Sequence, residues 1–394
     1  MRLPFKFTFW KGVLAVIWIL GIVATIIRFS RGLGASTNLS DQFPWGLWIG
    51  FDILCGVGLA AGGFTLAAIV YIFHIKRFYP ILRPTILTAF LGYLLVIFAL
   101  LFDLGQPWRI WHLLIYWNPH SVLFEVGWCV MLYTTVLAFE FSPILFERLG
   151  WGAPKKWIGK AIIPLVIAGV ILSTLHQSSL GSLYLIMPEK LYPFWYSPII
   201  PFLFFLSAVA VGCAMVIFES HLSYRAFGHR LKIGLLADLG RVMLVTLVVY
   251  AILRIQDFSG RGVWSYILVN RTETYLFWLE ALIGVIVPII LLAIKRVRLS
   301  ERGLYNVSIF IITGFLLNRL NVAVTGMEAS AGVHYFPSWM EISITLAIVA
   351  TGFFVFSLAA RYLPIFEHAE ENSKSERTVA ASEKITGFEV LPKT

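Results

Sequence analysis

Residues 45–74 of the chain read WGLWIGFDILCGVGLAAGGFTLAAIVYIFH, and this stretch decides the fold class. It holds a single charged side chain, Asp52, and an apolar run of this length can cross the hydrocarbon core of a bilayer as one helix. Small residues recur at Gly56, Gly58 and Gly62, where they let a neighbouring helix approach closely. The stretch therefore predicts a transmembrane helix that packs against other helices.

The composition of the whole chain agrees with a lipid environment. Of its 394 residues, 59% are hydrophobic and only 13% are charged, whereas soluble domains carry roughly 25% charged residues. The net charge of +10 comes from short basic clusters between apolar stretches, such as Lys155 and Lys156. That pattern is typical of membrane orientation, and it argues against a nucleic-acid partner.

Apolar runs near twenty residues long predict an all-α membrane protein with about ten transmembrane helices. The predicted spans cover residues 10–29, 45–74, 85–103, 121–141, 157–176, 198–219, 235–254, 274–294, 305–324 and 339–361. We expect two four-helix bundles with flanking helices. The expected units are 1–44 (first helix and outer loop), 45–197 (first bundle), 198–338 (second bundle), 339–364 (last helix) and 365–394 (a disordered tail).

Basic residues predict the orientation of these spans. Most of the 31 Lys and Arg residues lie at the N-terminus, in the loops after helices 2, 4, 6 and 8, and in the tail. The positive-inside rule places these segments in the cytoplasm. We therefore expect a multi-pass protein of the cytoplasmic membrane with both termini on the cytoplasmic side.

Ionisable side chains gather in the outer halves of the predicted spans. They are Asp52, Asp103, Glu125, His176, Arg254, Glu280, Arg319 and Glu341. Charges at membrane depth are costly and usually face a cavity or each other. We expect Asp52 and Glu280 to face a cavity or another charge. Arg319 and Glu341 are instead expected to extend to the interface as lone charges.

Cysteine and histidine positions argue against resident metal centres. The three cysteines lie far apart inside apolar segments, so no CxxC pair can hold an iron–sulfur cluster or zinc. A membrane cytochrome b needs facing axial histidines, and no histidine lies in the middle of a span. We expect no haem, although one near the outer surface, held by His176 with His120 or His334, stays an alternative.

Several motifs resemble those of one known superfamily. PWGLWIGFD at 44–52, NPHSVLFE at 118–125, FEFSPILFERLGW at 139–151, HQSSLGSL at 176–183, FWLE at 277–280 and YFPSWME at 335–341 carry the resemblance. Their order and spacing resemble the NrfD/polysulfide-reductase membrane-subunit superfamily, and within it the integral membrane subunits of periplasmic hydrogenase 2. Subunits of sulfite-reductase-linked complexes are also similar.

The resemblance implies a haem-free subunit that exchanges electrons with a membrane quinone, with menaquinone as the expected species. Its implied partners are an extracytoplasmic ferredoxin-like iron–sulfur subunit and a multihaem cytochrome c or hydrogenase subunits. Such a subunit holds no redox centre of its own, so oxidoreductase activity belongs to the complex.

Polar groups of the first bundle then become candidates for the quinone site. His176 and Asp52 are expected to serve the quinone carbonyls and their protons, with Ser178 or Ser179 as hydroxyl donors. Glu125 is expected to act as a proton relay and Trp48 as a wall of the site.

A second hypothesis is a proton path through the second bundle. It would use Glu280 and Arg254 in the outer half, and Asp238, Arg241, Glu219 and Glu140 in the inner half. The alternative for Asp238 and Arg241, spaced i,i+3, is an ion pair that locks two helices. For the whole chain, the competing functions are a secondary transporter and a passive anchor for an external enzyme.

Overall fold

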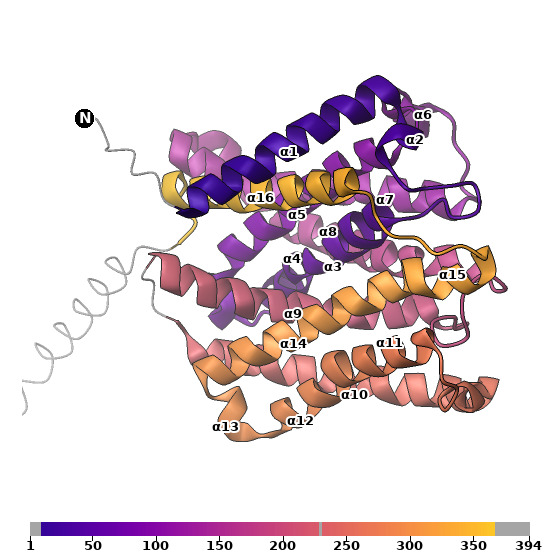
Figure 1. Cartoon of the computed structure of the whole chain (residues 1–394). Helices are drawn as coiled ribbons and strands as arrows, with labels where there is room; N and C mark the ends of the chain where they lie inside the picture. The colour runs from indigo at the N-terminus through magenta and orange to yellow at the C-terminus, as the bar shows by residue number, and fades with distance from the viewer. Residues whose placement is uncertain (1–8, 228–230, 367–394) are drawn as a thin grey trace, which may run out of the picture.

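The computed structural model describes residues 9–227 and 231–366, which form helices joined by short connections (Figure 1). The described ranges contain no strand. The ten helical spans that are long and apolar enough to cross a membrane confirm the predicted all-α membrane fold, counted over these ranges. The expected disordered tail lies outside the described residues from residue 367 onward.

Most spans are continuous helices. They are α1 (Phe9–Arg31), α5 (Tyr79–Asp103), α7 (Val122–Leu149), α8 (Gly152–Leu185), α9 (Ile200–Phe227), α10 (Ile233–Arg261) and α16 (Trp339–Tyr362). Short helical turns connect them: α2 (Leu33–Ser36), η3 (Lys76–Phe78), η4 (Pro107–Arg109), α6 (His112–Ile115), η5 (Val263–Tyr266) and α13 (Lys295–Arg298).

The second, eighth and ninth spans are interrupted by π-helical segments. Span 2 consists of η1 (Trp48–Cys55), α3 (Gly56–Leu59), α4 (Gly62–Ala67) and η2 (Ala68–Ile72). Span 8 consists of α11 (Thr272–Ala281), η6 (Leu282–Ile286) and α12 (Val287–Ala293), and span 9 of α14 (Glu301–Leu320), η7 (Asn321–Thr325) and α15 (Gly326–Ala331). Such π-helical segments are rare and often mark functional positions.

We call spans 2 to 5 the first group, or first bundle, and spans 6 to 9 the second. Because α8 of the first also packs along α9 of the second, this division stays a prediction. In the first group, span 2 contacts α5 and α8, α5 contacts α7, and α7 lies against α8. In the second, α9 contacts α10 and α14, and α12 contacts both α10 and α14. The helices α1 and α16 pair along one edge of the molecule, where α16 also contacts α5 (Figure 1).

The glycine-rich stretch of span 2 joins the two groups. A Cβ atom built on Gly62 would lie 3.0 Å from the Gly212 carbonyl oxygen, and one on Gly212 would lie 2.7 Å from the Ala61 carbonyl carbon. Backbones that come this close require small side chains on both helices. The close approach predicted from the sequence is therefore confirmed, and its partner is α9.

Candidate functional site

His176 is the centre of a buried polar group in the first bundle. We call this set the His176 group; it comprises Ser173, His176 and Gln177 of α8, Tyr93 of α5 and Tyr133 of α7. The His176 ring is fully buried, and neither ring nitrogen has a hydrogen-bond partner among the described residues. It lies beside Tyr93, with ring centroids 5.8 Å apart, and Tyr93 packs edge-on against Tyr133 at 4.7 Å.

A break in span 2 explains the position of Gln177. At Ala61 the backbone amide donates to the Gly58 carbonyl at 3.0 Å, in a tighter turn than an α-helix makes. The Gln177 Nε2 atom donates to the Val57 carbonyl at 3.2 Å. A side chain of α8 thus satisfies a carbonyl at the irregular part of span 2, as buried backbone groups require. This contact fixes His176 next to the break.

Glu125 and Ser179 meet on the side of the His176 group toward the start of α7. The Ser179 hydroxyl donates to Glu125 Oε1 at 2.5 Å, which joins α8 to α7. Ser179 is buried, whereas Glu125 is exposed on the first turn of its helix. The Ser178 hydroxyl donates to carbonyls of its own helix, at Thr174 and Leu175. Of the two predicted hydroxyl donors, Ser179 is the one that contacts Glu125.

Trp48 and Asp52 face a different set of neighbours. Asp52 is buried and accepts a hydrogen bond of 2.7 Å from Thr345 of α16. Trp48 is 1% exposed, packs near Phe102 of α5, and its indole N–H has no partner in the described chain. The six predicted quinone-site residues therefore lie in three groups, one of which, Trp48 with Asp52, packs against α5 and α16.

Glu341 is a buried structural residue, so the expectation that it extends to the interface as a lone charge is wrong. It is fully buried, and its carboxylate accepts from the Tyr335 hydroxyl and from the backbone amides of Asn38 at 3.0 Å and Ser338 at 2.9 Å. Burial raises the pKa of Tyr335, which keeps its hydroxyl protonated as a donor. The sequence did not reveal that the loops before η1 and before α16 close over this carboxylate.

The second bundle holds a network centred on Glu280. Its carboxylate accepts hydrogen bonds from Trp195 Nε1 at 2.9 Å, Asn318 Nδ2 at 2.7 Å and Asn321 Nδ2 at 2.9 Å. The Asn318 carbonyl accepts from the Arg319 guanidinium at 2.6 Å. A buried carboxylate and a buried guanidinium are thus linked through one amide, as buried charges require. We call this set the Glu280 network.

Arg319 is 1% exposed, so its predicted position at the interface is also wrong. Its guanidinium donates to the Ser207 hydroxyl at 2.7 Å and lies 3.6 Å from the centre of the Phe204 ring. Neighbouring helices, rather than water, satisfy its donors. The Asn318–Arg319–Asn321 cluster in an otherwise apolar span was the sequence signal for this network.

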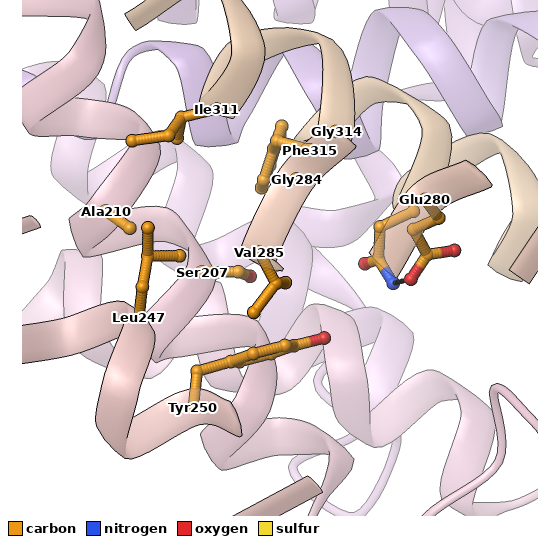
Figure 2. Close-up of a pocket in the computed structure, with 11 residues that line it drawn as sticks. Ser207, Ala210, Leu247, Tyr250, Glu280, Gly284, Val285, Ile311, Gly314 and Phe315 are labelled. Atoms are coloured by element: carbon orange, nitrogen blue, oxygen red, sulfur yellow. Dashed lines mark hydrogen bonds between the residues drawn. The ribbon is translucent and has the colours of Figure 1, made fainter. Parts of the chain in front are cut away.

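A small cavity of about 40 Å³ adjoins the Glu280 network (Figure 2). Its polar lining comes from Ser207, Tyr250, Glu280 and Asn318, and its apolar lining includes Gly284 and Phe315. A second cavity of about 10 Å³ also touches Tyr250 and Asn318, and is lined by Arg254 and Arg319 as well. The first cavity has the volume and the polar partners that an internal water needs.

The other predicted proton-path residues occupy separate places. Arg254 donates to the Phe194 carbonyl and lies over the Phe258 ring. Glu219 of α9 accepts from the Thr88 hydroxyl of α5 at 2.7 Å. Glu140 lies on α7, within the first bundle.

Asp238 and Arg241 form an ion pair, which was the alternative to a role in the proton path. Asp238 contacts Arg241 at 2.6 Å on its own helix and Arg77 at 2.8 Å. Both arginine side chains are more than half exposed, so the pair lies at the surface and joins α10 to the turn η3.

Metal-ligating side chains are dispersed over the described residues. No group of three or more His, Cys, Asp or Glu side chains in those ranges could hold a metal ion. His120 is exposed, and the His334 side chain is 98% exposed beside Glu328, whereas His176 is fully buried. The three histidines of the alternative haem site therefore have very different surroundings.

The sequence did not single out the residues that surround His176. Tyr93, Tyr133 and Ser173 lie within apolar runs, where aromatic and small residues normally mean core packing. Only the tertiary structure brings their hydroxyls to one place.

Known proteins resemble this chain over most of its length. An integral membrane subunit of menaquinone reductase from Nitratidesulfovibrio vulgaris is 31% identical, with 94% of each chain covered. A probable Ni/Fe-hydrogenase 2 b-type cytochrome subunit from Escherichia coli is 33% identical, with 92% of each chain covered. An integral membrane subunit of an Hdr-like menaquinol oxidoreductase from Archaeoglobus fulgidus is 22% identical over 71% of this chain and 69% of the relative.

A family model also matches most of the chain. The model described as "Polysulphide reductase, NrfD" matches residues 35–331, which include both helix bundles and every predicted quinone-site residue. A match of this length, together with relatives above 30% identity over whole chains, establishes the family. The chain therefore belongs to the NrfD polysulphide reductase family.

Proposed function

We propose that this chain is the quinone-reactive membrane subunit of a respiratory redox complex. It exchanges electrons between the membrane menaquinone pool and extracytoplasmic iron–sulfur, cytochrome or hydrogenase subunits. Relatives named as menaquinone reductase, menaquinol oxidoreductase and hydrogenase subunits support this function. The single structural observation that carries it is His176, a fully buried imidazole whose two nitrogens have no partner in the described chain.

The quinone head group is assigned to the outer half of the first bundle. A bound quinone supplies two carbonyl oxygens that become hydroxyls when two electrons and two protons are added. His176 offers a ring nitrogen to one oxygen, and the Ser179–Glu125 pair carries protons at the outer side. Asp52, held by Thr345, serves the second oxygen, and the Trp48 indole N–H is a further donor in the wall of the site. Ser178, next to Ser179 on α8, is an alternative hydroxyl donor.

The unpartnered buried atoms fit such a ligand. A buried donor or acceptor without a partner costs about 1–3 kcal/mol, and the first bundle holds several such groups, at Trp48, Tyr93, Tyr133, Ser173 and His176. A quinone carbonyl satisfies an imidazole or indole N–H, while its ring and tail need the apolar surroundings that the bundle supplies. A passive anchor would have no reason to retain these groups.

Activity of the purified complex tests the assignment. His176→Gln and Asp52→Asn should assemble with their redox partners and lose about 10²-fold or more of quinone turnover, because each removes a positioned proton-transfer group. His334→Gln is the matched control, since that histidine is exposed on an outer loop. Full turnover in both variants would place the site elsewhere, and a chain that purifies without quinone or redox partners would favour a transporter or an anchor.

Proton translocation through the second bundle is a further part of the proposal. The Glu280 network and its cavity form the outer segment, with Arg254 at its side. Glu219, Asp238 and Arg241 are the candidates for the inner segment, and Arg77 pairs with Asp238 at its surface. Reconstituted complex that turns over quinone without moving charge would refute this part and leave the quinone site intact.

A further inference from the structure

The connection between α5 and α7 returns along the side of α7. Its short helix α6 carries Leu113, whose carbonyl oxygen accepts a hydrogen bond of 3.0 Å from Trp128 Nε1 of α7. A Cβ atom built on Gly127 would lie 2.5 Å from the Leu113 side chain, so the glycine leaves the space that this leucine fills. The Trp117 ring also packs on the Trp128 ring, with centroids 4.6 Å apart. These contacts hold the connection against α7.

The contacts lie where the apolar part of this span begins. Gly127 and Trp128 follow the start of α7 at Val122 by about 8 Å along the helix axis. Residues 126–139 of the helix contain no charged side chain. The connection, which includes α6 at one end of the molecule (Figure 1), therefore lies beside the first turns of a membrane span.

The side chains that point away from α7 are apolar. Residues 107–117 read PWRIWHLLIYW, and Arg109 is the one formal charge among them. We call these residues the interfacial segment. Large exposed apolar side chains that gather on one segment mark an interaction surface. In the interfacial segment, the side chains that are between 38% and 67% exposed are Trp108, Ile110, Trp111, Leu114, Ile115 and Tyr116.

The lipid bilayer is the occupant that this surface fits. Trp128, which contacts the segment, shares one face of α7 with Leu132 and Phe139, because they follow it at helical spacing. Leu132 and Phe139 are 43% and 45% exposed in the middle of the span, so the surface of the segment continues the lipid-facing surface of α7. Trp and Tyr side chains favour the boundary between headgroups and acyl chains. The exposed Arg109 is long enough to reach headgroup phosphates from there.

We infer that the interfacial segment lies in the boundary between headgroups and acyl chains, in the leaflet at the start of α7, with its exposed side chains in contact with phospholipid. The inference goes beyond the proposed function and does not depend on quinone chemistry. It also fixes the membrane depth of Glu125, which lies between Phe124 and Trp128 on the turn that Trp117 packs against.

Spin labels on single introduced cysteines test this placement. The test positions are Leu114→Cys and Ile115→Cys, whose side chains are 51% and 62% exposed. Leu132→Cys, in the middle of α7, is the reference for lipid, and Ala153→Cys, exposed at the start of α8, is the reference for water. The three native cysteines are buried and should take up little label. The whole complex is studied in nanodiscs of phosphatidylethanolamine and phosphatidylglycerol, after its subunit content and melting temperature are shown to match the wild type.

The measurement is the collision rate of each label with oxygen, which concentrates in lipid, and with a nickel chelate, which stays in water. We expect the ratio of oxygen to nickel collisions at Leu114 and Ile115 to be several-fold above that at Ala153 and to approach that at Leu132. Such a ratio fits side chains that lie about 5–10 Å into the boundary region. A ratio equal to that at Ala153 would overturn the inference, because the segment would be an aqueous loop. Low collision rates with both reagents would also overturn it, because a redox partner or a second copy of the chain would then cover the segment.

Discussion

Arg319 illustrates how a single buried charge is tolerated in this protein. Its guanidinium donates to Asn318 and Ser207 and lies over the Phe204 and Phe315 rings. The side-chain nitrogen of Asn318 donates to Glu280. One amide therefore links the two opposite charges, and each stabilises the other. Removal of one charge leaves the other buried without compensation, which is far more costly than removal of both.

We therefore predict that Arg319→Met destabilises the protein by about 3–5 kcal/mol. The double variant Glu280→Gln/Arg319→Met should lose less than the sum of the two single changes, because neither charge is then left alone. Thermal unfolding in detergent, followed by tryptophan fluorescence, measures both effects. Arg302→Met, at an exposed position of the same helix, is the control. Additive effects would show that the two charges are independent.

At the scale of secondary-structure elements, three of the four π-helical segments in the described residues lie at or next to buried charged residues. Asp52 lies within η1, Glu280 comes just before η6, and Arg319 just before η7. A π turn inserts one extra residue and rotates the following part of the helix.

The contact between η6 and α14 is a second consequence of these broken spans. A Cβ on Gly284 would lie 2.9 Å from the Gly314 Cα atom, so the two backbones touch beside the cavity. We predict that Gly284→Ala separates the helices and lowers the free energy of unfolding by about 3 kcal/mol.

Gly159→Ala provides the comparison for that variant. Gly159 is in α8, and no neighbouring side chain or helix lies within 4 Å of the position that an alanine methyl group would occupy. Alanine there should therefore be neutral or stabilise the helix by up to about 1 kcal/mol. Both variants are compared by thermal unfolding in detergent. Equal melting temperatures would contradict the role assigned to backbone contact at Gly284.

For the whole molecule, orientation in the membrane decides which side supplies protons. The basic clusters predict that the start of α8 is cytoplasmic and that the loop before α11 is extracytoplasmic. The side of the membrane at which the proposed quinone site lies depends on this arrangement.

Labelling of single introduced cysteines tests the orientation. We predict that Asn270→Cys reacts with a membrane-impermeant maleimide in intact cells, and that Ala153→Cys reacts only after the membrane is opened. The three native cysteines are buried, so their background should be low. The reverse labelling pattern would show that the molecule has the opposite orientation, with the predicted quinone site on the cytoplasmic side.

The sequence by itself determined the fold class of this protein and the number of spans. Twenty-residue apolar runs have few alternatives to a transmembrane helix, because a bilayer offers the backbone no other hydrogen-bond partners. The small residues of 45–74 likewise predicted close packing, since a glycine face in lipid favours another helix. Motifs such as HQSSLGSL at 176–183 were enough to indicate the correct family.

Only the tertiary structure decided which polar residues meet. Glu341 and Arg319 look like interfacial charges in the sequence, yet loops and helices from distant parts of the chain enclose both. Tyr93 and Tyr133 look like core residues, yet α5 and α7 bring their rings together beside His176 of α8. The physical reason is that hydrophobicity acts on each span separately, whereas the partners of a buried polar group depend on how the spans rotate and pack against one another.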